Sequence, residues 1–273
     1  MQASPVWTPP SGTLGGIVAE ARDRAAALRA RRAELMRASA AVGTVPSLSA
    51  ALRTATVGVI AEVKRRSPSK GWINPAMVSV ERACAYETGG AAAISVLTEP
   101  AHFGGSIDDL IAVRAGVRVP VLKKDFHVEP IQLLEAKAIG ASAALLIARA
   151  LSPREFRDML AVAGELDLEV LVEVRDEDEL SRALDAGARL IGINNRDLET
   201  LVIDPTTSER VLGSIPASVV AVAESGVASR ADVERLARAG ADAVLVGSAV
   251  SASADPAAAV RELSSVPRII RER

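Results

Sequence analysis

The stretch "RAGADAVLVG", residues 238–247, decides the fold, because it leads from a helix into a buried strand through a single glycine. A glycine directly after a helix adopts the left-handed conformation that ends the helix without a Cβ clash. The apolar run that follows suits a strand buried on both faces, as in parallel sheets. The same pattern recurs at residues 88–97, 138–147 and 185–194. We therefore predict four helix-to-strand junctions.

Four further apolar runs are predicted strands that alternate with these junctions, at residues 58–64, 119–126, 168–175 and 218–226. Helical periodicity separates consecutive strands, at residues 78–88, 106–116, 130–139, 153–164, 177–186, 206–213, 229–239 and 255–264. Eight strand–helix units in 273 residues favour one closed (β/α)8 TIM barrel over an open doubly wound sheet. No GxGxxG turn follows the first strand, and the units lack the fixed period of a solenoid.

An amphipathic pattern at residues 13–42 precedes the first strand and carries Leu14, Ile17 and Val18 on one face. We predict one helix here. The favoured interpretation is a lid that shields apolar surface at the barrel end, and direct substrate contact is the alternative. The predicted domains are an N-terminal helical extension packing on the barrel, residues 1–50, and the catalytic barrel, residues 51–273.

Composition limits the partners and the cellular location. The chain is 49% hydrophobic but only 2% aromatic, and its formal net charge is -2, with no basic run among aromatic residues. We therefore expect no nucleic-acid partner. The single cysteine, Cys84, allows no intramolecular disulfide. No window reaches the ~18 apolar residues of a membrane span, so we expect a cytoplasmic protein without a membrane partner.

Polar side chains stand at the carboxyl ends of the predicted strands, where barrel enzymes carry their active sites. Glu62 and Lys64 are two residues apart in the first strand and therefore point the same way. The later strands end at Lys124, Glu173, Asn194 and Glu224. Burying such groups together costs free energy unless they neutralise one another or a ligand, so the set indicates a catalytic site. The alternative is an ion-pair network that merely closes the barrel.

Two adjacent lysines end the third strand, and alternation sends only one of them into the barrel. We choose Lys124 as the inward residue, which makes Lys123 an exterior or interface lysine. Arg196 and Asp197 follow Asn194, and an ion pair that fixes the loop explains them as well as substrate contact does. Neither enters the predicted catalytic set. His102 has no carboxylate at metal-ligand spacing in the sequence, so no metal site is predicted.

A phosphate site is predicted after the seventh and eighth strands. "ESGV", residues 224–227, and "VGSAV", residues 246–250, offer glycine-rich backbone N–H groups at the usual phosphate position of this fold. The candidate ligands are Gly226, Gly247 and Ser248, with Ser225 beside them.

With these residues in view, the chain resembles the indole-3-glycerol phosphate synthase family of tryptophan biosynthesis. The resemblance rests on "IAEVKRRSPSKG", "SVLTEPAHFGGS", "VLKKDF", "LVEV", "GINNRDL", "VAESGV" and "VGSAV", in the family's order over roughly residues 58–250. It implies a lyase that closes the ring of 1-(2-carboxyphenylamino)-1-deoxyribulose 5-phosphate to indole-3-glycerol phosphate, with loss of carbon dioxide and water. It also implies no metal or organic cofactor.

By the same resemblance, Lys124 is the general acid and Glu173 the base. Lys64 would hold the carboxylate and phosphate region of the substrate, while Glu62 orients the lysines and the substrate hydroxyls. The remaining matches are Asn194 and Ser225 as orienting residues, Glu224 as a supporting carboxylate and Ser67 near the substrate. Phe103 is a candidate for lining an apolar slot for the anthranilate ring.

Two alternatives stay open at this point. One is a phosphoribosylanthranilate isomerase or related sugar-phosphate isomerase on the same barrel. Such isomerases use a cysteine or aspartates as their acid/base pair, and the first strand here has no cysteine. The other is a barrel that binds sugar phosphate without turnover. The expected partner is the small-molecule substrate alone, in a monomer or a homodimer.

Overall fold

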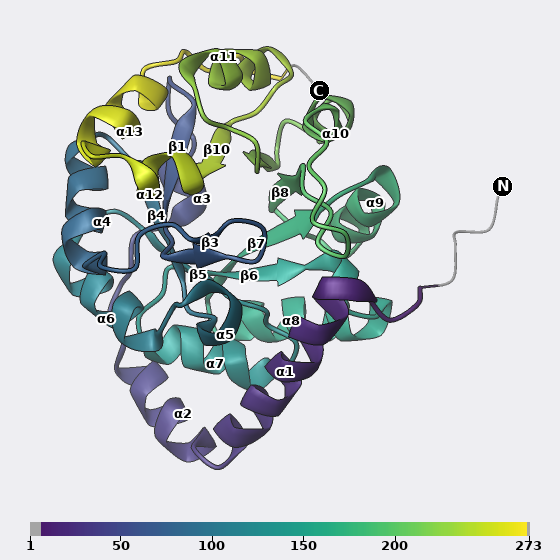
Figure 1. The fold of residues 1–273 in the computed structure, drawn as a ribbon. Coiled ribbons are helices and arrows are strands. Elements are labelled where there is room, and N and C mark those ends of the chain that lie inside the picture. The colour runs from purple at the N-terminus through teal and green to yellow at the C-terminus, as the bar shows by residue number, and fades with distance from the viewer. Residues whose placement is uncertain (1–6, 272–273) are drawn as a thin grey trace, which may run out of the picture.

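Helix-ending glycines stand where the repeated pattern places them. All four junction glycines have positive φ, for example 88° at Gly187 and 100° at Gly240. The strands that follow these glycines belong to a closed parallel barrel in the computed structural model, which describes residues 7–271 (Figure 1). Residues 1–6 of the predicted extension and residues 272–273 of the predicted barrel domain lie outside the described residues.

Eight strands close the barrel, in the spatial order β1-β10-β9-β8-β7-β6-β5-β4. They are β1 (Gly58–Val63), β4 (Ala93–Leu97), β5 (Val121–Lys124), β6 (Ala143–Ile147), β7 (Glu169–Val174), β8 (Leu190–Asn194), β9 (Val220–Glu224) and β10 (Ala243–Val246). Neighbouring strands in the chain are neighbours in space, and β10 pairs with β1 to complete the circle. The predicted TIM barrel is confirmed.

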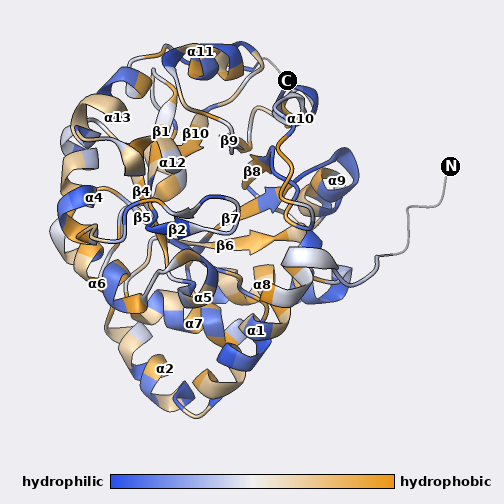
Figure 2. Ribbon diagram, viewed as in Figure 1, coloured by the Kyte–Doolittle hydropathy of each residue, from blue (hydrophilic) through white to orange (hydrophobic). Residues whose placement is uncertain are grey.

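A ring of helices covers the strands (Figure 1). The ring contains α4 (Ser79–Thr88), α6 (Ile107–Gly116), α7 (Pro130–Ala138), α8 (Pro153–Glu165), α9 (Glu177–Asp185), α10 (Thr206–Leu212), α11 (Arg230–Arg238) and α13 (Pro256–Ser264). Figure 2 shows hydrophobic strands inside and helices with polar residues outside. Ser152 and Ser229 begin α8 and α11 with capping boxes, which satisfy backbone N–H groups at the helix starts.

The N-terminal helical region differs from the prediction of one helix. It forms two helices, α1 (Gly12–Arg29) and α2 (Arg32–Ala41), that meet at a bend and lie against α7 (Figure 1). The bend lets Ala25 of α1 and Leu35 of α2 share one buried cluster with Ile131 and Leu134 of α7. Neither Gly nor Pro marks the bend, so tertiary packing sets its position. Among residues 7–271, no helix is both long and apolar enough to cross a membrane.

Short elements decorate the two ends of the barrel. At the carboxyl end of the strands lie a small hairpin, β2 (Arg66–Ser67) and β3 (Gly71–Trp72), and the helices α5 (Pro100–Phe103), η1 (Ala148–Ala150) and α12 (Ser248–Ala252). The helix α3 (Leu48–Ala51) precedes β1 at the other end, where Glu169 accepts hydrogen bonds from its first N–H groups.

Candidate active site

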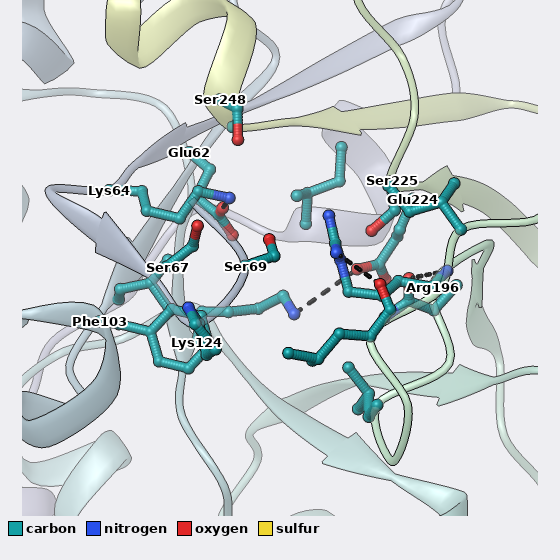
Figure 3. Close-up of a pocket in the computed structure, with 18 of the residues that line it drawn as sticks. Glu62, Lys64, Ser67, Ser69, Phe103, Lys124, Arg196, Glu224, Ser225 and Ser248 are labelled. Atoms are coloured by element: carbon teal, nitrogen blue, oxygen red, sulfur yellow. Dashed lines mark hydrogen bonds and ion pairs between the residues drawn. The ribbon is translucent and has the colours of Figure 1, made fainter. Parts of the chain in front are cut away.

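A cavity of about 480 Å³ opens at the carboxyl ends of the barrel strands. This cavity is lined by all twelve site residues predicted from the sequence: Glu62, Lys64, Ser67, Phe103, Lys124, Glu173, Asn194, Glu224, Ser225, Gly226, Gly247 and Ser248. They come from most of the strands and the loops that follow them, and Figure 3 shows the side chains of Glu62, Lys64, Lys124, Glu224, Ser225 and Ser248 around one space. The structure therefore brings together residues that are up to 186 positions apart, from Glu62 to Ser248 (248 − 62).

Lys124 lies at the centre of the charged groups. Its Nζ is 3.2 Å from Oε2 of Glu173 and 3.6 Å from Oε2 of Glu224. Burial alone lowers the pKa of Lys124, but the carboxylates of Glu173, Glu224 and Glu62 outweigh it and raise the pKa well above its ordinary value. Lys124 therefore carries its proton at neutral pH.

The surroundings of Glu224 favour its neutral form, whereas those of Lys124 favour the charged form. Burial raises the pKa of its carboxyl to about 8, and the nearby Glu173 and Glu62 add to the rise, although Lys124 opposes it. Oε1 of Glu224 has no hydrogen-bond partner among the described residues. At neutral pH the protonated form of Glu224 therefore predominates beside a protonated lysine.

Glu62 and Lys64 form an ion pair of 2.7 Å on the same face of β1 and its extension, as their spacing predicts. Burial raises the pKa of Glu62, but Lys64 and Lys124 more than offset this and hold it below its ordinary value. Gly247 makes room for the pair, because a Cβ there would lie 2.4 Å from Oε1 of Glu62 and 2.7 Å from Nζ of Lys64. Gly247 thus packs against the charged pair.

Asn194 fixes the carboxylate of Glu173. Its Nδ2 donates to Oε1 of Glu173 at 2.8 Å, and its Oδ1 accepts from the backbone N–H of Arg196 at 2.9 Å. Glu173 is 3% exposed and therefore meets water only through the cavity. Its two oxygens face Asn194 and Lys124, which leaves it held in one orientation.

The glycine-rich turns lie on the wall beside β9 and β10. Ser225 and Gly226 are consecutive residues with positive φ, 64° and 82°, at the end of β9. Gly247 and Ser248 lie at the start of α12. Figure 3 shows the side chains of Ser225 and Ser248 at the rim of the same cavity. The two turns therefore flank one space.

Lys123 faces the helix layer, as alternation predicts, and of the two predicted positions it takes the interface one rather than the exterior one. It is 1% exposed and pairs with Glu135 of α7 at 2.8 Å. The exterior alternative is wrong because α7 covers this part of β5. The cost of burying the ammonium is offset by the carboxylate of Glu135 and, at 4.0 Å, that of Asp125.

Arg196 is a pocket residue that sequence reasoning left out. Its side chain lines the cavity, and burial lowers its pKa. No carboxylate lies within ion-pair distance of it among residues 7–271, because Asp197 pairs with Arg175 at 2.9 Å instead. The guanidinium donates to the carbonyl of Leu201. Its position two residues beyond Asn194, on the same side of the chain, was the available signal.

The helix α1 supplies part of the cavity wall through Thr13, Leu14 and Ile17. Its start is tied to the loop after β8. Oε1 of Glu199 accepts from the N–H of Ser11 at 2.6 Å and pairs with Arg149 at 3.0 Å. The extension is therefore joined to the site rather than only shielding the barrel end.

His102 does meet carboxylates in space, although the sequence spacing gave no such signal. Its Nε2 is 3.0 Å from Glu20, and Glu99 lies close enough to complete a group of three possible metal ligands. Glu99 already accepts hydrogen bonds from the N–H groups of Ala101, His102 and Phe103 at the start of α5. The group is explained by helix capping and the contact between His102 and Glu20.

Comparison with known proteins identifies the relatives of this chain. A family model described as indole-3-glycerol phosphate synthase matches residues 14–263. The chain is 48% identical over 250 residues to the enzyme of that name from Mycobacterium leprae, covering 92% of this chain and 91% of the relative. It is 46% identical to indole-3-glycerol phosphate synthase 2 of Streptomyces coelicolor, covering 93% and 99%. A solved 3-hexulose-6-phosphate synthase superposes with a TM-score of 0.61 at 20% identity, over 77% of this chain and 99% of that one, which shows the shared fold.

Proposed function

The chain belongs to the indole-3-glycerol phosphate synthase family, and we propose that Lys124 and Glu173 carry the proton transfers of its reaction. The chain is a carboxy-lyase of tryptophan biosynthesis, so the isomerase and the non-catalytic barrel are set aside. The observation that supports the roles is the contact between a lysine and a carboxylate, 3.2 Å apart, inside the cavity.

Substrate binding needs cations at one side and N–H groups at the other. The substrate carries a carboxylate, an aromatic ring, a ketone and a phosphate. Its phosphate fits the two turns at Ser225–Gly226 and Gly247–Ser248, which offer backbone N–H groups and hydroxyls. Its ring fits the apolar side near Phe103, whose ring centroid is 6.1 Å from that of Phe126. Ser67, on the hairpin loop, borders the same space.

The substrate carboxylate has two candidate cations, Lys64 and Arg196. Lys64 is paired with Glu62, whereas Arg196 has no carboxylate partner among the described residues. We therefore assign Arg196 to the carboxylate, with Lys64 reaching toward both the carboxylate and the phosphate. Arginine suits this task because its planar fork binds a carboxylate through two hydrogen bonds.

Ring closure needs an acid. The ring carbon that bears the carboxylate attacks the ketone carbon, a C–C bond forms, and the ketone oxygen takes a proton from Lys124. The electron pair of the bond to the carboxylate then returns to the ring, and carbon dioxide leaves. Rearomatisation drives this step.

Dehydration needs an acid and a base. The hydroxyl leaves as water after it takes a proton from Lys124, which has regained one from solvent, and Glu173 removes the proton that completes the indole ring. Asn194 supports this role because it holds the carboxylate of Glu173 in one orientation. Per turnover the site takes up one proton, since an anionic carboxylate departs as neutral carbon dioxide.

The test is an assay of indole-3-glycerol phosphate formation by indole fluorescence, with the wild-type chain and Lys124→Met. The half-buried Lys137, which donates to the backbone carbonyl of Asp167 on the helix layer, offers a matched control in Lys137→Met. Formation that is equal in both variants would remove Lys124 from the mechanism.

The catalytic unit is proposed to be residues 51–273, with residues 1–50 as an extension that contributes a wall of the pocket. We propose action in the cytoplasm, where biosynthetic intermediates with a phosphate group are retained. The proposed assembly is a monomer or a homodimer, and sedimentation of the purified chain would distinguish them.

A further inference from the structure

Gly192 is a glycine in a place where backbone conformation does not require one. It lies inside β8, two residues before Asn194, so the two positions face the barrel interior on the same side of the strand. Its φ is not positive, so any residue type can adopt its backbone angles. Glycine inside a strand often marks the close approach of another group.

The group that approaches is the carboxyl of Glu224. A Cβ at position 192 would lie 2.1 Å from Oε1 of Glu224 and 3.3 Å from Cδ1 of Leu171. Real Cβ atoms essentially never come within 3.0 Å of another heavy atom, so an alanine here would have to displace something. The Cα of Glu224 pairs in register with Asn194, so its side chain runs back along β8 toward Gly192.

We propose that Gly192 is a positioning residue, because the space left by its missing side chain seats one oxygen of Glu224 and turns the other oxygen toward Lys124. Oε1 occupies this seat without a hydrogen-bond partner among the described residues, while Oε2 is 3.6 Å from Nζ of Lys124. The inference rests on the proposed function, in which Lys124 is the acid, and adds that Glu224 takes part as the supporting carboxylate beside it.

The seat also explains the protonation of Glu224. Its lining includes Leu171 and the glycine backbone, so burial is the largest cause that raises the pKa of Glu224 to about 8. The charged groups that face the carboxyl are Lys124 from β5, Glu173 from β7 and Glu62 from β1. A protonated Glu224 avoids placing a third carboxylate beside one lysine, and it holds a proton within the pocket.

Gly192→Ala is the direct test. The new methyl group would push the carboxyl by about 1 Å toward the cavity and water, and a displacement of that size lowers kcat by about 10- to 100-fold. KM should change little, because the turns that flank the phosphate are untouched. The pH above which activity falls should move downward, since a better-solvated carboxyl has a lower pKa.

A second background separates positioning from folding. In Glu224→Ala the seat is empty, so adding Gly192→Ala should lower kcat by less than about 2-fold. Gly164→Ala is the matched control, because nothing lies within 4 Å of a Cβ at that position. An equal loss from Gly192→Ala in both backgrounds, or unfolding in both by circular dichroism, would overturn the inference.

Carbon-13 NMR titration of the Glu224 carboxyl in the free enzyme gives a readout that does not depend on turnover. We expect a pKa near 8 in the wild-type chain and a lower value in Gly192→Ala. An unchanged titration would refute the seat. Full activity of Glu224→Ala would instead refute the proposed participation of Glu224 and leave the titration result standing.

Discussion

Nζ of Lys124 lies 3.2 Å from Oε2 of Glu173, although the two residues are 49 positions apart in the chain. The contact crosses the barrel interior from β5 to β7, over the intervening strand β6. It joins the proposed acid and the proposed base in one ion pair, so a proton given up by one is close to the other. The pair therefore links the ring closure to the later dehydration.

Removing the ammonium of Lys124 should remove the acid. Lys124→Met keeps an unbranched side chain that is one atom shorter and uncharged, and we expect kcat to fall by about 10²- to 10⁴-fold, the usual contribution of a positioned acid. Phosphate binding, measured by calorimetry with inorganic phosphate, should stay close to the wild-type value. Unchanged turnover in Lys124→Met would contradict the assignment.

Replacing the base should stop the reaction at a later stage. Glu173→Gln keeps the hydrogen bond to Asn194 but cannot accept a proton, so carbon dioxide should still be released. We expect a ring-closed, decarboxylated and still hydroxylated compound to accumulate, as detected by mass spectrometry of quenched samples. If unreacted substrate accumulates instead, Glu173 acts before decarboxylation.

Arg196 should contribute mainly to binding. Arg196→Ala removes the cation assigned to the substrate carboxylate, and hydrogen bonds to charged groups contribute about 1.5–3 kcal/mol. We expect KM to rise by about 10- to 100-fold. Arg175→Ala, which removes the partner of Asp197 at the edge of the same loop, is the comparison variant. A larger effect on KM from Arg175 than from Arg196 would point to loop structure rather than carboxylate binding.

His127 should make the protein less stable in mild acid. Burial is the main reason that its pKa is held near 3, and the nearby Lys123 adds to the effect. An unfolded histidine titrates near 6.5, so between these values the unfolded chain binds a proton that the folded chain does not. Stability is therefore complete above about pH 6.5 and falls as the pH decreases toward 3.

Urea denaturation at pH 7 and pH 5 measures this effect. Over that interval the contribution of His127 amounts to a loss of about 2 kcal/mol in the free energy of unfolding. The raised pKa of Glu224 stabilises the folded chain at lower pH in both proteins, so the test is the difference between them. From pH 7 to pH 5 the free energy of unfolding of His127→Gln should change by about 2 kcal/mol in the stabilising direction relative to that of the wild-type chain. Parallel changes in both proteins would show that His127 is not the source of the acid sensitivity.

Loosening the start of α1 should weaken substrate binding. Glu199→Ala removes the acceptor that holds Ser11 and Arg149. Because Thr13 and Leu14 line the cavity just beyond this contact, we expect a higher KM with a smaller change in kcat. Limited proteolysis should show faster cleavage near residues 8–13. A wild-type KM together with faster cleavage would show that the wall is dispensable for binding.

The barrel could be predicted from the sequence because its signals are local. Each junction glycine, such as Gly240, ends a helix and starts an apolar run, and both features lie within ten residues. The bend between α1 and α2 carries no such signal, since it depends on packing against α7. The two-residue strands β2 and β3 are too short to give a period, and two pairs of partners, Arg66 with Trp72 and Ser67 with Gly71, define the hairpin.

Two features of the sequence predicted the site: the positions where strands end and the alternation of side chains along each strand. They place Lys124 inward and Lys123 outward, but they do not reveal that α7 buries Lys123 beside Glu135. Arg196 is a candidate for binding the substrate carboxylate because it has no carboxylate partner among the described residues. The neighbouring Asp197 pairs with Arg175 instead. Which ion pair forms depends on which distant side chain lies within reach in the folded chain. No spacing along the sequence encodes this.

The tie between Ser11 and Glu199 has a consequence for the order of synthesis. During translation α1 leaves the ribosome ahead of every strand, yet the residues that hold it, in α7 and in the loop after β8, are made more than a hundred residues later. The apolar face of α1 therefore stays unpacked until most of the barrel has been synthesised. A nascent chain stopped before residue 130 would present that face to chaperones.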